Sequence, residues 1–442
     1  MGFMRSYYGS APADAATGGQ KESTRSGRCS RPCPARYTAP MRTPAEAMLE
    51  ILACVEPLGD VEPVPLLEAV DRVLAQDVVS GVDLPPFRKS AMDGFAVRCA
   101  DFGVAGETRL VVVGEARAGG PYEGSIEPGS CVAIYTGAVV PEACDAVVIV
   151  EKSTSHGAAV ALEDAPKPGQ NICNRGADLA RGALALGGGR RLTPTDLSVL
   201  ASVGRDPVAV YRRPRVAILT TGDELVRPGT PLTEGQIWEG NTLHLAGLAR
   251  RAGAEIVDVG LVTDEPAELE RRFGAALEES DLVITTGGVS MGAYDLVADV
   301  FVRLGVRQVF HKVAIKPGKP IWFGMRGQRP VFGLPGNPVS CLICHEVFVR
   351  PALAKMGGAD PEEWRERLRL GRWEGPSPRP NPRQQNLPVR VTEDAGGVLA
   401  LTPLDWSSSA DIVGLAAADG MAVVPPGETL ERGAIVSFRP LR

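Results

Sequence analysis

The fold is decided by the stretch Asp281-Leu-Val-Ile-Thr-Thr-Gly-Gly-Val-Ser-Met-Gly-Ala-Tyr-Asp295. Its first half is a short apolar run that predicts a buried strand. Its second half turns through Gly287, Gly288 and Gly292, with Ser290 between the last two. Glycines at the end of a strand allow backbone N–H groups to approach an anion closely. We therefore expect these four residues to contact a phosphate group of a substrate.

This loop matches neither common phosphate-binding motif, because the lysine of a Walker loop and the glycine spacing of a dinucleotide fingerprint are both absent. An ordinary turn is therefore the alternative interpretation of such a loop taken alone. A second apolar strand ends in the same way, in the stretch Val216-Ala-Ile-Leu-Thr-Thr-Gly-Asp-Glu-Leu225. Two such loops in one sheet favour a functional site.

Short apolar strands alternate with amphipathic helices around both loops. The expected strands are residues 216–219, 255–259 and 281–285, and the expected helices are residues 241–252 and 266–279. This alternation predicts a three-layer α/β/α domain with a largely parallel sheet. Ligands of such sheets bind at the carboxyl ends of the strands, so we expect the site there.

Carboxylates cluster at the same strand ends. Asp223 and Glu224 end one loop, Asp264 follows the strand at residues 255–259, and Asp295 closes the glycine loop. Mg²⁺ prefers such oxygen ligands together with substrate phosphates, so the group predicts a metal or substrate site. Helix capping is the alternative for each residue alone, because Asp is common at the start of helices.

A basic loop and a third glycine loop follow along the chain. Ala314-Ile-Lys-Pro-Gly-Lys-Pro320 places Lys316 and Lys319 on one turn, which suits an oxyanion, although solvated lysines are the usual case. The stretch Val331-Phe-Gly-Leu-Pro-Gly-Asn-Pro-Val-Ser-Cys341 is another strand that leaves through a loop into a helix. The residues of this loop that we expect to contact a substrate are Pro335, Gly336, Asn337 and Ser340.

The chain is too long, at 442 residues, for one compact domain. Residues 44–52 predict a helix that Thr43 caps, and residues 66–75 and 193–203 predict two more. Short β-branched runs between residues 80 and 174 predict strands. We expect the following domains: a disordered tail at 1–40, a discontinuous N-terminal domain of helical and extended segments at 41–80 and 176–213, a β-rich insertion at 81–175, the α/β domain at 214–360, and a small C-terminal β-barrel at 361–442.

The composition excludes several classes of protein. The net charge is −6 and no basic stripe with interleaved aromatics occurs, so no nucleic-acid partner is expected. No apolar run approaches the roughly 18 residues of a membrane span, so we expect a cytoplasmic protein without membrane contact. A transit peptide and a start-site artefact before Met41 remain open for residues 1–40. The run Cys341-Leu-Ile-Cys-His345 matches a haem-attachment pattern, but buried core thiols are expected, and no structural zinc site.

Six segments together resemble those of molybdopterin molybdenumtransferases, the bacterial MoeA proteins, and of the E domain of gephyrin. They occur in the family's order, from about residue 42 to the C-terminus: Leu84-Pro-Pro-Phe with Ser90-Ala-Met-Asp-Gly-Phe95, Tyr135-Thr-Gly-Ala138, Thr221-Gly-Asp-Glu-Leu225, Gly287-Gly-Val-Ser-Met-Gly292, Lys316-Pro-Gly-Lys-Pro320 and Leu334-Pro-Gly-Asn-Pro-Val-Ser340. Arg88 and Lys89 depart from the residues that many relatives carry, and Ser407-Ser-Ser-Ala-Asp411 resembles a family serine segment.

The resemblance implies the last step of molybdenum cofactor synthesis, in which molybdate and adenylylated molybdopterin react with release of AMP and Mg²⁺ is required. It also implies a homodimer whose cleft the partner's insertion completes. An upstream molybdopterin adenylyltransferase is the implied donor of the substrate. The positions that resemble catalytic residues are Asp93, Thr136, Asp178, Glu224, Asp264 and Asp295, and the metal ligands among them are Glu224, Asp264 and Asp295.

Other functions remain open from the sequence. Molybdopterin adenylyltransferases and nicotinamide nucleotide deamidase relatives carry similar glycine loops, although they lack the Ser-Ala-Met-Asp segment and the β-rich insertion. A scaffold protein like gephyrin is the non-enzymatic alternative, but no long linker or second cofactor domain accompanies the segments here. The sequence does not distinguish molybdenum from tungsten, because the two oxyanions have the same charge and nearly the same size.

Overall fold

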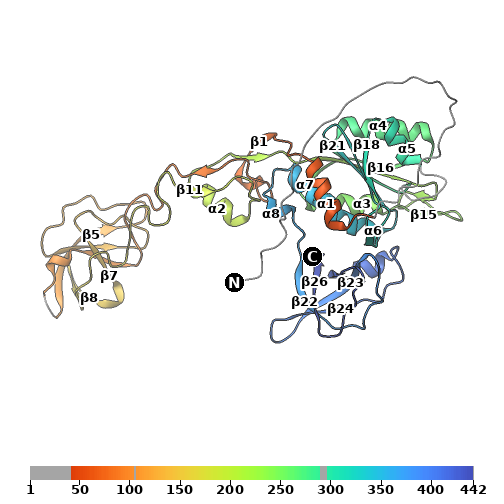
Figure 1. Ribbon diagram of the computed structural model, residues 1–442. Coiled ribbons are helices and arrows are strands. Elements are labelled where there is room, and N and C mark those ends of the chain that lie inside the picture. Colours follow the sequence, from red (N-terminus) through yellow and green to blue (C-terminus); the bar gives the residue numbers. More distant parts are fainter. Residues whose placement is uncertain (1–40, 104–105, 289–295, 442) are drawn as a thin grey trace, which may run out of the picture. The chain divides into compact units, whose positions relative to one another are not determined.

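The computed structural model describes residues 41–103, 106–288 and 296–441 (Figure 1). The expected tail at residues 1–40 lies outside the described residues, and so do Ser290, Gly292 and Asp295. In the described ranges, no helix is both long enough and apolar enough to span a bilayer.

A mixed six-stranded sheet forms the centre of the α/β domain. Its strand order is β16-β13-β17-β21-β20-β18. The bounds of these strands are β13 (Arg215–Thr221), β16 (Glu255–Val262), β17 (Leu282–Thr286), β18 (Arg307–His311), β20 (Trp322–Arg326) and β21 (Arg329–Leu334). The first four strands in this order pair in parallel, whereas β20 and β18 join antiparallel. The prediction of a largely parallel sheet is confirmed.

Helices cover both faces of this sheet, as Figure 1 shows for the helices labelled there. The helices on one face are α1 (Pro44–Cys54), α3 (Asn241–Arg251), α6 (Pro338–Cys344), the π-helical turn η4 (His345–Val349) and α7 (Arg350–Met356), and those on the other are α4 (Pro266–Glu279) and α5 (Leu296–Arg303). Residues of β13 alternate between the faces, with Val216 and Ile218 in one core and Ala217 and Leu219 in the other. The three-layer α/β/α prediction is confirmed.

Helix α1 begins as the sequence predicts. The Thr43 hydroxyl accepts from the Glu46 backbone N–H, and the Glu46 carboxylate accepts from the Thr43 backbone N–H at 2.8 Å. Its apolar side, which includes Ala47 and Ile51, packs into the core of the central sheet. Lys355 of α7 also donates to the Leu52 carbonyl at 2.8 Å. The helix therefore packs with the α/β domain, whereas the domain boundaries expected from the sequence assign it to the N-terminal domain at 41–80 and 176–213.

Two small sheets and a helix form the next part of the chain. Their elements are β1 (Val61–Val64) with β12 (Val208–Tyr211), β2 (Val78–Val79) with β11 (Leu184–Leu186), η1 (Leu66–Glu68) and α2 (Pro194–Ser202). The prediction of a helix at residues 66–75 is wrong, because only one 3₁₀ turn, η1, forms there. Asp71 has a left-handed φ of 62°, and Val73 and Leu74 form β-bridges with neighbouring segments. Backbone pairing therefore replaces the helix.

The β-rich insertion contains a six-stranded sheet of order β7-β4-β6-β5-β9-β8 and a short pair β3-β10. The bounds are β3 (Lys89–Ser90), β4 (Gly94–Val97), η2 (Cys99–Asp101), β5 (Thr108–Ala116), β6 (Ser130–Ile134), β7 (Ala146–Ile149), η3 (Val150–Lys152), β8 (Ser153–His156), β9 (Ala159–Leu162) and β10 (Ile172–Cys173). The β-branched runs of the sequence lie in β5, β6 and β7, as predicted.

Five C-terminal strands close into a barrel of order β23-β24-β22-β26-β25, because β25 pairs back onto β23. Short β19 (Ile315–Lys316) of the basic loop joins this sheet through β23. The bounds are α8 (Pro361–Trp364), β22 (Arg369–Trp373), β23 (Gln384–Glu393), β24 (Leu399–Pro403), α9 (Ile412–Ala416), β25 (Gly420–Val424) and β26 (Ile435–Pro440). The predicted small C-terminal barrel is confirmed.

Candidate functional site

A cavity of about 450 Å³ lies at the carboxyl edge of the parallel strands. Its wall includes the ends of β13, β17 and β21, the first turn of α3, the pair β14 (Leu225–Val226) and β15 (Ile237–Trp238), and the start of α9. Of the predicted site residues that the structure describes, four line it, and they are Glu224, Gly287, Gly336 and Asn337. The site therefore forms at the edge that the strand pattern predicts.

The glycines of the loop after β17 are required by packing. Gly287 has a φ of +88°, and a Cβ there would lie 2.2 Å from the Thr221 carbonyl oxygen. A Cβ on Gly288 would lie 2.5 Å from a methyl group of Val297. The loops after β13 and β17 thus approach one another through bare backbone, which leaves Gly287 on the cavity wall.

A buried carboxylate, Glu239, forms part of the cavity wall and was missed from the sequence. It accepts from the backbone N–H of Thr242 at 2.8 Å and from the Thr242 hydroxyl. The Thr220 hydroxyl lies 3.5 Å from the same carboxylate. Glu239 therefore fixes the start of α3 against the end of β13. The only signal in the sequence is an acidic residue just before the helical pattern.

Asn241 is the second residue that the sequence did not reveal. Its side-chain amide donates to the Gly336 carbonyl at 2.7 Å and lies 3.5 Å from the Thr286 hydroxyl. The Thr286 hydroxyl in turn donates to the Pro335 carbonyl at 3.2 Å. Three separate segments therefore meet at one point, and this fixes the loop at Pro335 and holds Gly336 on the cavity wall.

The carboxylates at the ends of β13 and β16 are brought together in part. Asp264 accepts from the Thr221 hydroxyl, and its backbone N–H donates to Asp223 at 3.4 Å. Glu224 lies exposed on the cavity wall, with its carboxylate 2.7 Å from the position of a Cβ on Gly222. Within the described ranges, no group of three His, Cys, Asp or Glu side chains is placed to hold a metal ion. The third expected ligand, Asp295, lies outside those ranges.

The two lysines of the basic loop do not line this cavity. Lys316 and Lys319 are both exposed. Between them, Gly318 packs closely against Cys344, since a Cβ on Gly318 would lie 2.9 Å from the Cys344 sulfur. The C-terminal barrel fixes the turn from the other side, since Asn386 donates to the Lys316 carbonyl at 3.4 Å. The loop therefore has a defined backbone, and among the described residues its two lysine amines form no ion pair.

The loop after β21 is tied to the C-terminal domain. The Asn337 side-chain amide donates to the Ser409 hydroxyl at 2.7 Å, and the Val339 backbone N–H donates to the Ser409 carbonyl at 3.1 Å. Backbone N–H groups of Gly414 and other residues lower the pKa of Asp411, which ends this serine segment. Ser340, expected to donate to a substrate, is instead buried within α6.

Three predicted residues of the N-terminal half lie apart from the cavity wall. Asp93 is exposed and accepts from both the backbone N–H and the hydroxyl of Thr136, each at 2.7 Å. These two bonds, the hydroxyl first, lower the pKa of Asp93. Asp178 is exposed, and its backbone N–H donates to the Leu84 carbonyl at 2.8 Å. The structure thus joins Asp93 to Thr136 but neither to Glu224.

The run Cys341-Leu-Ile-Cys-His345, which matches a haem-attachment pattern, is part of the core, as expected. Cys341 and Cys344 are fully buried, and burial raises the pKa of the Cys341 thiol to about 12. His345 is also fully buried, with its Nδ1 3.2 Å from the Glu346 carboxylate. His244 extends from α3 to the cavity wall, and burial lowers its pKa. A neutral imidazole therefore borders the site.

Three family models match successive parts of this chain. Residues 42–204 match the MoeA N-terminal region (domain I and II), residues 217–355 match the probable molybdopterin binding domain, and residues 373–441 match the MoeA C-terminal region (domain IV).

Curated proteins and solved structures agree with these matches. Molybdopterin molybdenumtransferase of Haemophilus influenzae is 42% identical over 303 residues, which is 68% of this chain and 74% of that protein. Molybdopterin molybdenumtransferase of Bacillus subtilis is 33% identical and covers 84% of this chain and 87% of its own. The crystal structure of the molybdopterin biosynthesis protein moeA of Pyrococcus horikoshii OT3 has a TM-score of 0.77 at 29% identity, covering 90% and 99% of the two chains.

Proposed function

The chain belongs to the family of molybdopterin molybdenumtransferases, transferases of the final step of molybdenum cofactor biosynthesis, and we propose that it inserts molybdenum into adenylylated molybdopterin with release of AMP. The observation that carries the proposal is the cavity at the carboxyl edge of the sheet. There Glu224, Gly287, Gly336 and Asn337 come together from three strand ends. Loops of this kind offer backbone N–H groups to phosphate oxygens.

The polar groups around the cavity suit a substrate that carries a phosphoanhydride. Gly287 and Gly336 present bare backbone, so phosphates can approach their amides without a side chain between them. The Asn337 side chain, held by Ser409, and the buried Glu239 carboxylate complete a polar wall. Hydrogen bonds from fixed groups orient the substrate for reaction.

The donor set fits a hard divalent cation that the substrate helps to hold. Mg²⁺ is ordinarily bound by one or two carboxylates together with substrate phosphates rather than by a cage of protein ligands. Asp223 and Asp264 lie together at the adjoining ends of β13 and β16, Glu224 follows on the cavity wall, and Asp295 is the further expected ligand. When bound, the ion would neutralise charge on the phosphoanhydride. The Thr221 hydroxyl holds the Asp264 carboxylate in place for this role.

Lys316 and Lys319 are assigned to the molybdate dianion, because they are the exposed positive charges of a turn that both the sheet domain and the C-terminal barrel fix. Asp93, Thr136 and Asp178 lie on the N-terminal half, outside the cavity wall. In a homodimer, a partner subunit could supply such residues to the cleft, and this is the role we propose for them. We also propose a cytoplasmic enzyme that receives its substrate from a molybdopterin adenylyltransferase.

The test is a reaction with defined components. The protein is incubated with adenylylated molybdopterin, Mg²⁺ and either molybdate or tungstate, and AMP and the pterin product are measured by mass spectrometry. We expect one AMP for each metal inserted and no AMP release without Mg²⁺. Metal insertion without AMP, or AMP release that does not depend on an oxyanion, would contradict the proposal.

A further inference from the structure

A second cavity, of about 390 Å³, shares no lining residue with the candidate site. Arginine side chains dominate its wall. The arginines that line it are Arg191, Arg213, Arg250, Arg251, Arg350 and Arg367. Among the described residues, the acidic side chains of this wall are Asp71 and Glu363. The wall therefore carries a strong excess of positive charge, and we call it the arginine cavity.

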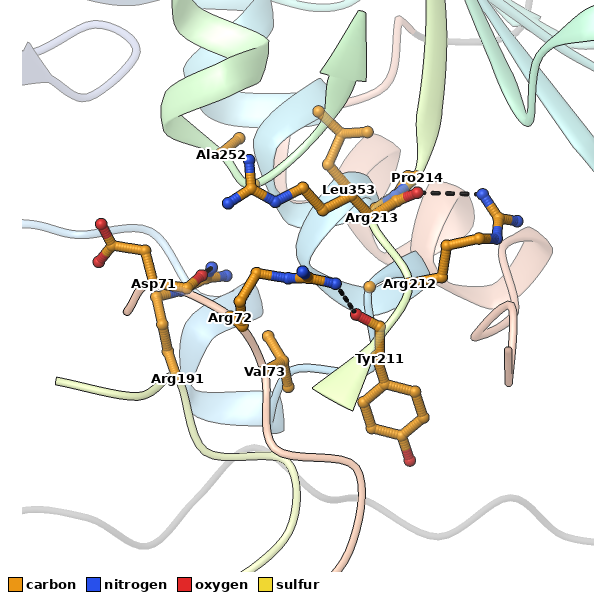
Figure 2. A pocket seen from close by; sticks show the side chains of 12 residues that line it. Asp71, Arg72, Val73, Arg191, Tyr211, Arg212, Arg213, Pro214, Ala252 and Leu353 are labelled. Carbon is orange, nitrogen blue, oxygen red and sulfur yellow. Dashed lines mark hydrogen bonds between the residues drawn. The ribbon is translucent and has the colours of Figure 1, made fainter. Parts of the chain in front are cut away.

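A narrower hollow adjoins the arginine cavity, and the two share Asp71, Arg191, Arg213, Ala252 and Gly253. Figure 2 shows this hollow, with Arg72 donating to the Tyr211 carbonyl, at 2.9 Å. Arg72 is only 9% exposed, and its Nε has no hydrogen-bond partner in the described part of the chain. The same guanidinium also donates to the Glu62 carboxylate, so Arg72 fixes the wall of the hollow.

Several arginines of the cavity have structural partners that fix the wall. Arg191 bonds to the Glu363 carboxylate at 2.9 Å and to the Asp71 carbonyl at 2.8 Å. Arg350 is buried and donates to the carbonyls of Glu363 and Arg365 at 2.8 and 2.6 Å. These bonds connect segments that are far apart in the sequence. They hold the guanidinium groups of Arg191 and Arg350 in place without a ligand.

Three other arginines of the wall have no such ion-pair partner among the described residues. Arg213, Arg250 and Arg251 are exposed, and none has a carboxylate within ion-pair distance in the described ranges. Arg251 donates to the Leu441 carbonyl at 3.2 Å, which leaves its charge unpaired. Arg250 and Arg251 end α3, where positive charge balances the helix dipole. That reason does not apply to Arg213, which precedes β13. Like charges around one cavity repel, so an anion placed among them is stabilised.

We propose that the arginine cavity binds a small anion with two or more phosphate groups. Guanidinium groups recognise phosphate oxygens through paired hydrogen bonds, and several of them around one cavity suit a ligand with several negative charges. The cavity volume lies in the range of small-molecule sites. Its described wall contains no aromatic side chain, so the phosphates rather than a stacked base provide recognition. This site goes beyond the proposed function, which uses a separate cavity.

The test must separate this site from the candidate active site. Lys316→Met with Lys319→Met removes the two charges of the basic loop, and pyrophosphate binding to this full-length variant is measured by titration calorimetry without Mg²⁺, on which the candidate active site is proposed to depend for phosphate binding. Arg213→Gln with Arg250→Gln is then added. We expect the lysine variant to bind pyrophosphate, and each lost arginine to weaken binding about tenfold, the value for a hydrogen bond between charged groups. Arg390→Gln is the matched control, an exposed arginine of β23 outside this wall.

Two further arms identify the source of the phosphates. Tripolyphosphate and ATP are titrated against the same variants. Equal affinities indicate a free polyphosphate, and tighter binding of ATP indicates a nucleotide, and either result supports the shared chemistry. Pyrophosphate binding that the arginine substitutions leave unchanged overturns the proposal. A change in the oligomeric state of the arginine variant, measured by light scattering, also overturns the proposal. Carboxylates of a second chain would then be the partners of these arginines.

Discussion

Asn337 donates its side-chain amide to the hydroxyl of Ser409 across 2.7 Å, and this bond joins the loop after β21 to the C-terminal domain. The Ser409 carbonyl also accepts from the Val339 backbone N–H at 3.1 Å. Ser409 therefore contacts both the last loop residue and the first turn of α6. The barrel domain thus helps to shape the cavity, although it provides no strand of the central sheet.

The first prediction concerns this bond. Asn337→Ala and Ser409→Ala, combined in a double-mutant cycle, should show a coupling energy of about 1 kcal/mol, the usual net value of a hydrogen bond. The coupling should appear in the KM for the pterin substrate, because the bond orients a cavity residue. Ser155→Ala, which changes an exposed serine of β8, is the control. Additive effects of the two substitutions would show that the bond has no role.

The second prediction concerns the packing of the two glycine loops. Gly287→Ala should lower the free energy of unfolding by about 3 kcal/mol or more, because it adds both a disfavoured φ and a contact with the Thr221 carbonyl. Gly305→Ala is the matched control, since Gly305 has a φ of +80° with no atom within 4 Å of its Cβ position. That variant should lose only about 1 kcal/mol. Urea unfolding measures both, and equal losses would show that the contact is relieved elsewhere.

The sequence predicted the central domain well because its signals are local. Apolar runs of β13 and β17 and the amphipathic pattern of α4 lie wholly within single elements, and the short length of the runs and the glycines that follow them identify the strands. The parallel edge then follows from the alternation of elements, which is why Glu224, Gly287 and Asn337 were expected near one another. Residues 66–75 failed for the opposite reason, since pairing of Val73 and Leu74 with distant segments overrides their helical pattern.

The missed residues depend on contacts between elements. Glu239 and Asn241 are ordinary polar residues at a helix start, and only the packing of α3 against the loops after β13 and β21 turns them toward the cavity. Ser340 shows the reverse, because a serine that looked available after a loop is buried once α6 packs. The arginine cavity likewise combines residues from several segments, so the short arginine pairs of the sequence do not reveal that they share one wall.

The third prediction concerns the carboxylates. Glu224→Gln and Asp264→Asn should fold normally but lose AMP release by about 100-fold or more, the usual effect of removing one electrostatic contact in an active site. The residual rate should respond less to Mg²⁺ than that of the unmodified protein. Glu234→Gln, a change of an exposed carboxylate outside the cavity wall, should leave both unchanged. Full turnover in the first two variants would remove these residues from the site.

The last prediction concerns Lys316 and Lys319, whose side chains are exposed on a turn fixed by Gly318 against Cys344 and by Asn386. This turn lies outside the wall of the candidate cavity, and a dianion that passes it on the way to a pyrophosphate and several carboxylates must meet positive charge. Two charges about 4 Å apart interact by about 4 kcal/mol in an effective dielectric of about 20, before desolvation. Replacing both lysines by Met keeps the apolar stem and removes the charge.

The double variant should therefore need much more molybdate for half-maximal turnover, while binding of adenylylated molybdopterin weakens less. Because both side chains are exposed and the turn is held by backbone contacts, its thermal unfolding midpoint should stay within a few degrees of the original. Molybdate titration at saturating pterin, with pterin affinity measured separately, distinguishes the two effects. An unchanged molybdate requirement with weaker pterin binding would assign the lysines to the phosphates instead, since positive charge on this turn would then act on the pyrophosphate alone.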